Sequence, residues 1–207
     1  MNRFRSFMAK LTPTKIFPFV LIIFGIIGLA SSVTISLEKT SLLKNPESSL
    51  ICDLNPVYSC AKVIDSAPSQ TLGVPNEIMG MVMFSALITV GVVLLSGGKM
   101  KKWFWQLFLL GMLGFTASII RLFYISVYEI GALCVLCSTV WFSGWAITAT
   151  GYAWVYDQGI IKTTKRYGSA LGYIRRNIIG FWLLLIIIFA FLALNHFWYY
   201  YGQYFGA

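Results

Sequence analysis

The four cysteines are the residues of this 207-residue chain whose type and spacing best suit chemistry. Cys134 and Cys137 form a Cys-x-x-Cys motif, whereas Cys52 and Cys60 lie eight positions apart. Residues three apart on a helix share a face, and the positive end of the helix dipole favours a thiolate and lowers its pKa. The Cys134/Cys137 pair is therefore predicted to carry redox chemistry.

Two other uses of four cysteines have to be weighed against redox chemistry. One is a pair of structural disulfides, for which the loop of a Cys-x-x-Cys motif is too short to make a good staple. The other is a zinc site, but the spacing of Cys52 and Cys60 is not the short knuckle spacing of four-cysteine sites. No metal is therefore expected.

Five long apolar segments must position these cysteines. The chain is 58% hydrophobic and only 11% charged, and the segments comprise residues 16–37, 78–96, 103–127, 133–155 and 178–197. Each is close to the roughly 20 residues with which a helix crosses a bilayer, where every backbone polar group must be paired. The sequence therefore predicts an all-α integral membrane protein with five transmembrane helices.

The chain has a net charge of +9, and its basic residues are concentrated in alternate connections between the spans. Twelve basic residues fall before the first span, after the second and after the fourth, and only Lys39, Lys44 and Lys62 fall in the alternate segments. The positive-inside rule then puts the amino terminus in the cytoplasm, and the carboxyl terminus and all four cysteines outside, where disulfides persist. The charge indicates topology, and no nucleic-acid partner is expected.

Three stretches around the cysteines carry a resemblance to a known family. They read CDLNPVYSC at 52–60, LGVPNEIMG at 72–80 and GALCVLC at 131–137, and Trp141 follows. In order and spacing, over about residues 31–145, they resemble the vitamin K epoxide reductase family, in particular bacterial homologues that couple disulfide formation to a membrane quinone. The DsbB type of quinone-dependent oxidase carries its Cys-x-x-Cys in the first outer loop, which is the reverse order.

The resemblance implies a four-helix bundle around a quinone, either menaquinone or ubiquinone. By position, Cys134 and Cys137 resemble the active-site pair at the outer end of the fourth helix. Cys52 and Cys60 resemble a loop pair that relays electrons.

Two further positions match quinone contacts of the family. Asn76 matches an Asn that hydrogen-bonds a quinone oxygen, although Asn at a helix start is also a frequent cap. Trp141 stands where the vertebrate enzymes carry a quinone-contacting Tyr. Its indole is a donor without a hydroxyl group, a substitution that is compatible with quinone reduction and leaves epoxide reduction open.

The expected organisation follows from the spans and the resemblance. Residues 1–15 form a cytoplasmic segment, 16–155 the catalytic bundle with outer loop 38–77, 156–177 a basic cytoplasmic loop, and 178–207 a fifth helix with a short outer tail. Many bacterial relatives continue into a thioredoxin-like domain, whereas this chain stops. The expected partner is therefore a separate DsbA-like protein outside the cell membrane.

Three functions remain open from the sequence. The first is oxidation of such a partner with electron transfer to a quinone. The second is a small-molecule quinone or vitamin K epoxide reductase driven by another thiol. The third is a non-catalytic membrane scaffold with structural disulfides.

Two smaller features also carry predictions. Residues 59–65 are expected to form either a short helix capped by Ser59, with Val63 and Ile64 available to press into the membrane surface, or an ordinary turn packed on the loop. Arg121, in the third span, either snorkels to the outer interface, contacts a quinone or pairs with Glu129.

Overall fold

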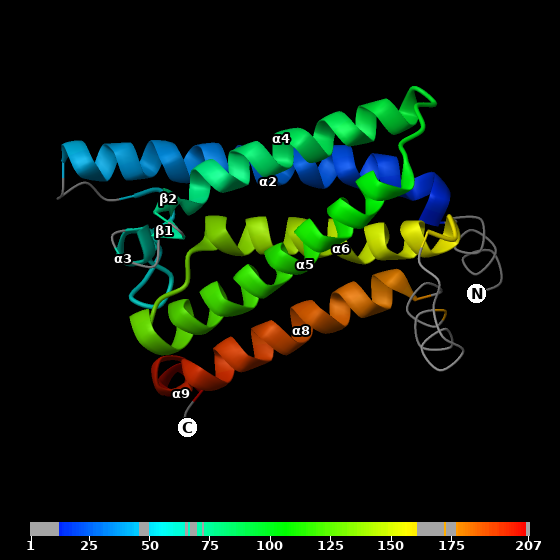
Figure 1. The fold of residues 1–207 in the computed structure, drawn as a ribbon. Helices are drawn as coiled ribbons and strands as arrows, with labels where there is room; N and C mark the ends of the chain where they lie inside the picture. Colours follow the sequence, from blue (N-terminus) through cyan, green and yellow to red (C-terminus); the bar gives the residue numbers. More distant parts are fainter. Residues whose placement is uncertain are drawn as a thin grey trace.

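The computed structural model of this chain describes residues 13–45, 50–64, 66, 70–71, 73–160, 172 and 177–205. Each of the five predicted spans corresponds to a long helix, and the helices run lengthwise together (Figure 1). They are α2 (Pro13–Lys44), α4 (Asn76–Leu95), α5 (Lys102–Tyr124), α6 (Val135–Asp157) and α8 (Ile178–His196). The protein is all-α, as predicted. Eight of the basic residues that were predicted to lie on the cytoplasmic side fall outside the described residues. They are at positions 3, 5, 10, 162, 165, 166, 175 and 176.

The shorter elements gather at one end of the long helices. Helix α3 (Cys60–Ile64) and the antiparallel pair β1 (Gln70–Thr71) and β2 (Val74–Pro75) lie there, near the start of α6 (Figure 1). At the same end α5 continues into a π-helical turn, η2 (Ile125–Ile130), which stops at Gly131 with a φ of 69°. We call this the cysteine end. The last helix, α9 (Trp198–Phe205), follows α8.

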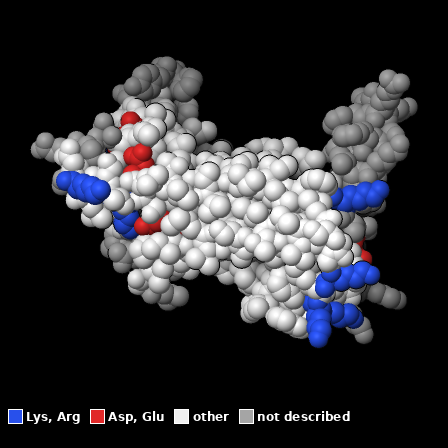
Figure 2. Space-filling model, turned by 90° about the horizontal axis from the view of Figure 1, so that it is seen from above, with Lys and Arg blue, Asp and Glu red and all other residues white. Residues whose placement is uncertain are grey.

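Four of the long helical segments are long and apolar enough to cross a membrane. Among the described residues they are Lys15–Lys44, Asn76–Leu95, Lys102–Ile130 and Ile178–His196. Charged side chains lie mainly at the two ends of the molecule, and an uncharged band separates them (Figure 2). These features are those of a multi-pass membrane protein.

Helix α6, the fourth predicted span, is not one of these four segments. It is 23 residues long, but Ser, Thr and Gly interrupt its apolar residues, and about half of its side chains are buried. It packs against α2, α5 and α8, so that its environment is protein more than lipid. Close packing needs glycine here, because a Cβ on Gly144 would collide with the ring of Phe115 on α5.

Helix α2 extends well beyond its predicted span at the cysteine end. Helix α2 runs to Lys44 rather than to residue 37, so the connection expected from residue 38 begins later. Polar contacts, which a hydropathy pattern does not predict, stabilise this extension. Glu38 Oε2 accepts a hydrogen bond from the backbone N–H of Ile51 at 3.4 Å, and Lys39 forms an ion pair with Glu77 of α4.

Candidate functional site

Cys134 lies at the N-cap of α6, with its side chain fully buried. Its Sγ accepts a hydrogen bond from the backbone N–H of Cys137 at 3.3 Å. The hydrogen bond from the Cys137 side chain, aided by backbone N–H groups and opposed by burial, lowers the pKa of the Cys134 thiol. The helix dipole was expected to lower this pKa, whereas the first cause here is the neighbouring Cys137 side chain.

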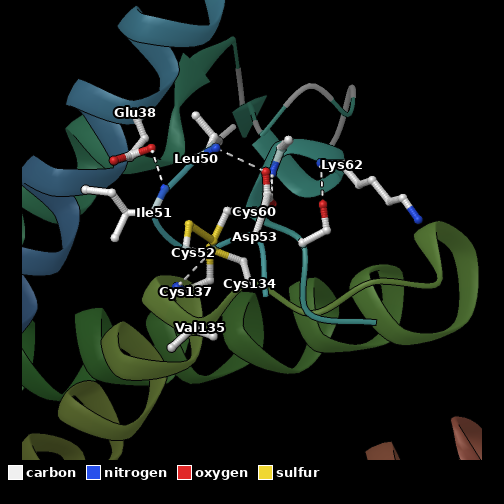
Figure 3. Close-up of a disulfide and its surroundings, with 12 residues drawn as sticks. Glu38, Leu50, Ile51, Cys52, Asp53, Cys60, Lys62, Cys134, Val135 and Cys137 are labelled. Carbon is white, nitrogen blue, oxygen red and sulfur yellow. Dashed lines mark hydrogen bonds between the residues drawn. A yellow bond between two sulfur atoms is a disulfide. The ribbon is translucent and has the colours of Figure 1, made fainter. Parts of the chain in front are cut away.

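The loop cysteines meet Cys134 directly. Cys52 and Cys60 form a disulfide, whereas Cys134 and Cys137 are free thiols. Sγ of Cys60 lies 3.0 Å from Sγ of Cys134 (Figure 3). The sulfurs of Cys52, Cys60 and Cys134 lie within 4.8 Å of one another. Because two of these three are bonded to each other, the cluster suits disulfide exchange rather than a metal ion, which needs thiolate ligands.

A backbone bridge holds Cys60 over Cys134. Residue Leu133 donates its N–H to the carbonyl of Val57 at 2.7 Å and accepts from the N–H of Ser59 at 3.0 Å. We call these two bonds the Leu133 bridge. Since Ser59 precedes Cys60 and Leu133 precedes Cys134, the bridge fixes the register of the two cysteines.

Side chains of the loop shape it for this bridge. Asn55 Oδ1 accepts from the N–H groups of Val57 and Tyr58 at 2.9 and 2.8 Å. Asp53 accepts from the N–H groups of Ala61 and Leu50 at 3.1 and 3.4 Å (Figure 3). Neither residue was predicted to have a role, although short polar side chains that bind nearby backbone N–H groups are typical of turns.

The predicted short helix exists as α3 and begins at Cys60, directly after Ser59. The hydroxyl of Ser59 lies 3.5 Å from the N–H of Lys62, the predicted capping arrangement. Val63 and Ile64, expected to be available for the membrane surface, instead line a cavity inside the protein, and Ile64 is buried. The helix therefore covers the bundle.

The cavity lies on the other side of the Cys-x-x-Cys motif. It has a volume of about 520 Å³, and Cys137 lines it. Most of its wall is apolar and comes from α2, α4, α5 and α6, including Ile35, Met79, Met83, Ile119, Leu122 and Val140. Drug-sized ligands bind in pockets of about this size that are mainly apolar with a few polar groups.

Both predicted quinone contacts lie in the cavity wall. Asn76 is the first residue of α4, and the N-cap position belongs to Pro75, so that Asn76 does not occupy the capping position that we considered. Trp141 is 6% exposed, and its ring centroid lies 6.1 Å from that of Phe123. Cys137, Asn76 and Trp141 thus line one cavity.

Two charged residues in the same wall were missed by the sequence analysis. Lys39 Nζ lies 3.0 Å from Glu77 Oε1, and both side chains line the cavity. Arg121 is exposed and does not line it, and it forms no ion pair with Glu129, although both residues are described. This agrees with a snorkelling Arg121.

The wall fits a quinone head group, which is a flat apolar ring with two carbonyl oxygens. Apolar side chains line most of the space, and donors that suit carbonyl oxygens are the Asn76 amide, the Trp141 indole and the Lys39 ammonium.

A comparison with protein-family models gives a match to the vitamin K epoxide reductase family over residues 19–154. The match covers most of the chain and includes the cysteines and the cavity. The chain belongs to the vitamin K epoxide reductase family. A search among curated proteins finds no significant match.

Membership in the vitamin K epoxide reductase family identifies a membrane oxidoreductase that works between thiols or disulfides and a quinone. Proteins of this family use a quinone as electron partner and generally work with a thioredoxin-like protein. The cavity beside Cys137 fits the quinone.

Proposed function

We propose that this protein oxidises the dithiol of a separate, DsbA-like protein and passes two electrons through Cys52/Cys60 and Cys134/Cys137 to a membrane quinone. One observation carries the proposal. Sγ of Cys60 is 3.0 Å from Sγ of Cys134, while Cys137, one helical turn further, lines the cavity. One cysteine of the motif therefore contacts the loop disulfide, and the other lines the cavity.

The first steps take place at the loop pair. A thiolate of the partner attacks Cys52, and Cys60 leaves as a thiolate. The second thiol of the partner then displaces Cys52, so that the partner leaves with a disulfide and the loop pair is a dithiol. Each exchange passes through a mixed disulfide and needs the attacking and attacked sulfurs in contact.

The next steps take place at α6. Cys60 attacks Cys134 of a Cys134–Cys137 disulfide and releases Cys137. Cys52 then attacks Cys60 and displaces Cys134, whose lowered pKa makes it a good leaving group. The result is a loop disulfide beside a Cys134/Cys137 dithiol, which is the pattern in this structure.

The cavity completes the reaction. A bound quinone supplies an acceptor for two electrons and two protons, whose uptake restores the Cys134–Cys137 disulfide. Cys137 is the thiol in the wall, Asn76 and Trp141 offer hydrogen bonds to carbonyl oxygens, and the apolar wall excludes water.

The proposal includes the sidedness predicted from charge. Lys99 and Lys101 precede α5 and Lys102 begins it, whereas Cys134 and Cys137 lie at the other end of α5, where α6 begins. The positive-inside rule then puts the cysteine end outside the cell membrane, with residues 16–155 as the catalytic bundle.

The test is quinone reduction by the purified protein in detergent. Electrons come either from a small dithiol or from a reduced DsbA-like protein, and intact protein is compared with Cys52→Ala, Cys134→Ala and Cys137→Ala. We expect the last two variants to lose turnover with both reductants, and Cys52→Ala to lose it only with the protein.

Other outcomes would point to the alternative functions. Equal activity of Cys52→Ala with the reduced protein would indicate a small-molecule reductase that uses another thiol. The absence of cysteine-dependent reduction with any benzoquinone or naphthoquinone would overturn the enzymatic function and leave a scaffold with structural disulfides.

A further inference from the structure

The ion pair of Lys39 and Glu77 is the feature of the cavity that the relay does not use. Lys39 comes from the extended end of α2 and Glu77 from the first turn of α4. Their side chains are 18% and 7% exposed, in a wall that is otherwise mostly apolar. Charges in such surroundings are costly, and within membrane proteins they usually have a function.

The contact leaves the hydrogen-bonding capacity of Lys39 unused. Nζ lies 3.0 Å from Glu77 Oε1, but the contact lacks hydrogen-bond geometry. Among the described residues the buried Nζ has no hydrogen-bond partner. An ammonium group has three donors, and burying them without acceptors is unfavourable. The cavity wall therefore contains an ion-paired cation whose N–H groups can donate to a further oxygen.

We propose that Lys39 is a direct contact for an oxygen of the quinone head group, and that Glu77 is a positioning residue that holds Lys39 in the cavity wall. This inference rests on the proposed function. Asn76, adjacent to Glu77, would then be one of two donors to the head group from this part of the wall.

The pair would favour electron transfer through its charge. Oxidation of the Cys134 and Cys137 thiols to a disulfide releases two electrons and two protons, and the quinone takes up both as it becomes a quinol. The protons balance without a net change at Lys39 or Glu77. A fixed ammonium stabilises negative charge that develops on an oxygen before its proton arrives, and it does so most strongly where water is excluded.

A different role for the pair would be to tie α2 to α4 without touching the quinone. The two roles predict different relative effects when each residue of the pair is substituted. Lys39→Met and Glu77→Gln both break the ion pair, so a tie alone predicts similar losses. A direct contact predicts that Lys39→Met loses far more quinone affinity than Glu77→Gln, in which the ammonium remains.

The experiment measures the dissociation constant of a short-chain prenylated naphthoquinone by tryptophan fluorescence quenching of full-length protein in detergent. It also measures KM and kcat for its reduction, and the thermal midpoint. We expect Lys39→Met to weaken binding about tenfold or more, which is the size of a hydrogen bond from a charged donor. Lys39→Arg should restore most of the affinity. Lys44→Met, which removes an exposed charge from the same helix, is the matched control and should change nothing.

A variant without either charge separates a loss of quinone binding from a folding defect caused by an unpaired buried charge. Lys39→Met combined with Glu77→Gln leaves no unpaired buried charge, and it should still bind the naphthoquinone about tenfold more weakly than Glu77→Gln alone. Equal affinities of these two proteins, or equal losses in Lys39→Met and Glu77→Gln, would overturn the contact. If intact protein neither binds nor reduces any quinone, the proposed function itself fails.

Discussion

The two sulfurs of the Cys-x-x-Cys motif face two regions that are built differently. On the Cys134 side, the side chains of Leu50, Cys52, Cys60 and Cys134 pack into one cluster and are at most 6% exposed. Backbone hydrogen bonds of the Leu133 bridge fix this region. On the Cys137 side, a cavity of about 520 Å³ replaces close packing.

The difference corresponds to the two kinds of chemistry. Disulfide exchange requires sulfur atoms in contact and in line, so the region around Cys134 is dense and its backbone is fixed. Reduction of a separate organic molecule requires room for that molecule, so the region around Cys137 is hollow and mostly apolar. Changes at residues that belong to one side alone, such as Asn55 or Asn76, should therefore leave the other side intact.

The largest expected effect is the trapping of one specific mixed disulfide. In the double variant Cys52→Ser/Cys137→Ser the remaining cysteines, Cys60 and Cys134, have no resolving partner, and their sulfurs are 3.0 Å apart in the intact protein. We expect nearly complete formation of a Cys60–Cys134 disulfide on mild oxidation, detected by mass spectrometry of non-reduced peptides.

The matched control for trapping is Cys60→Ser/Cys137→Ser, which leaves Cys52 and Cys134. The Leu133 bridge fixes the register of Cys60, not of Cys52, over Cys134, so this pair should cross-link much more slowly. Equal rates in the two double variants would show that the bridge does not select the exchanging cysteine.

The next largest effect is expected at Asn76, on the cavity side. Asn76→Asp removes the amide donor and adds negative charge to the cavity wall, so quinone affinity should fall about tenfold. Fluorescence quenching by a naphthoquinone measures this. Asn45→Asp, an exposed position at the end of α2, is the control. The rate of Cys60–Cys134 trapping should be unchanged when Asn76→Asp is added to the trapping variant, and a slower rate would contradict the separation of the two sides.

A smaller effect is expected at Asn55, on the loop side. Asn55→Ala removes the acceptor for the N–H groups of Val57 and Tyr58, at a cost of about 1–3 kcal/mol for donors left unpaired. In the trapping variant, the Cys60–Cys134 disulfide should then form severalfold more slowly. Asn55→Asp keeps an acceptor oxygen and should restore the rate. Quinone affinity should be unaffected, and a loss of it would show that the loop also shapes the cavity.

The sequence predicted the parts of the site that follow from local patterns. Apolar segments of sufficient length predicted the helices, and the motifs around Cys52, Asn76 and Cys134 predicted which residues lie together. The family match supports the membership on which the motif predictions rested.

What the sequence did not predict depends on contacts between distant segments. Lys39 and Glu77 each looked like a polar residue at the end of a span, and only the packing of α2 against α4 makes them a buried pair. The sequence also did not predict which way Val63 and Ile64 face, because an apolar residue on a short helix can face lipid or protein. The family resemblance implied a quinone site at Asn76 and Trp141, but no local pattern predicts the volume of the cavity or the rest of its wall, since it is a space between packed helices.

The smallest expected effect is a shift in the pH dependence of exchange. In the reverse direction, the Cys134 thiolate attacks Cys60 and releases Cys52, which a maleimide can capture. The rate follows the thiolate fraction of Cys134, whose pKa is lowered first by the hydrogen bond from the Cys137 side chain. A lowered pKa keeps the thiolate at lower pH, so removing the donor should raise the pKa and move the rate profile to higher pH.

Two variants at position 137 isolate this hydrogen bond, because both lack the competing thiol. Cys137→Ala removes the side-chain donor, whereas Cys137→Ser keeps a hydroxyl donor at nearly the same place. The profile should lie at higher pH in Cys137→Ala than in Cys137→Ser. Identical profiles would mean that the backbone N–H groups at the start of α6 alone stabilise the thiolate. In that case the side chain of Cys137 would contribute nothing to exchange on the loop side. The two regions would then be separate in their electrostatics, although they share packing residues such as Ile64 and Val140.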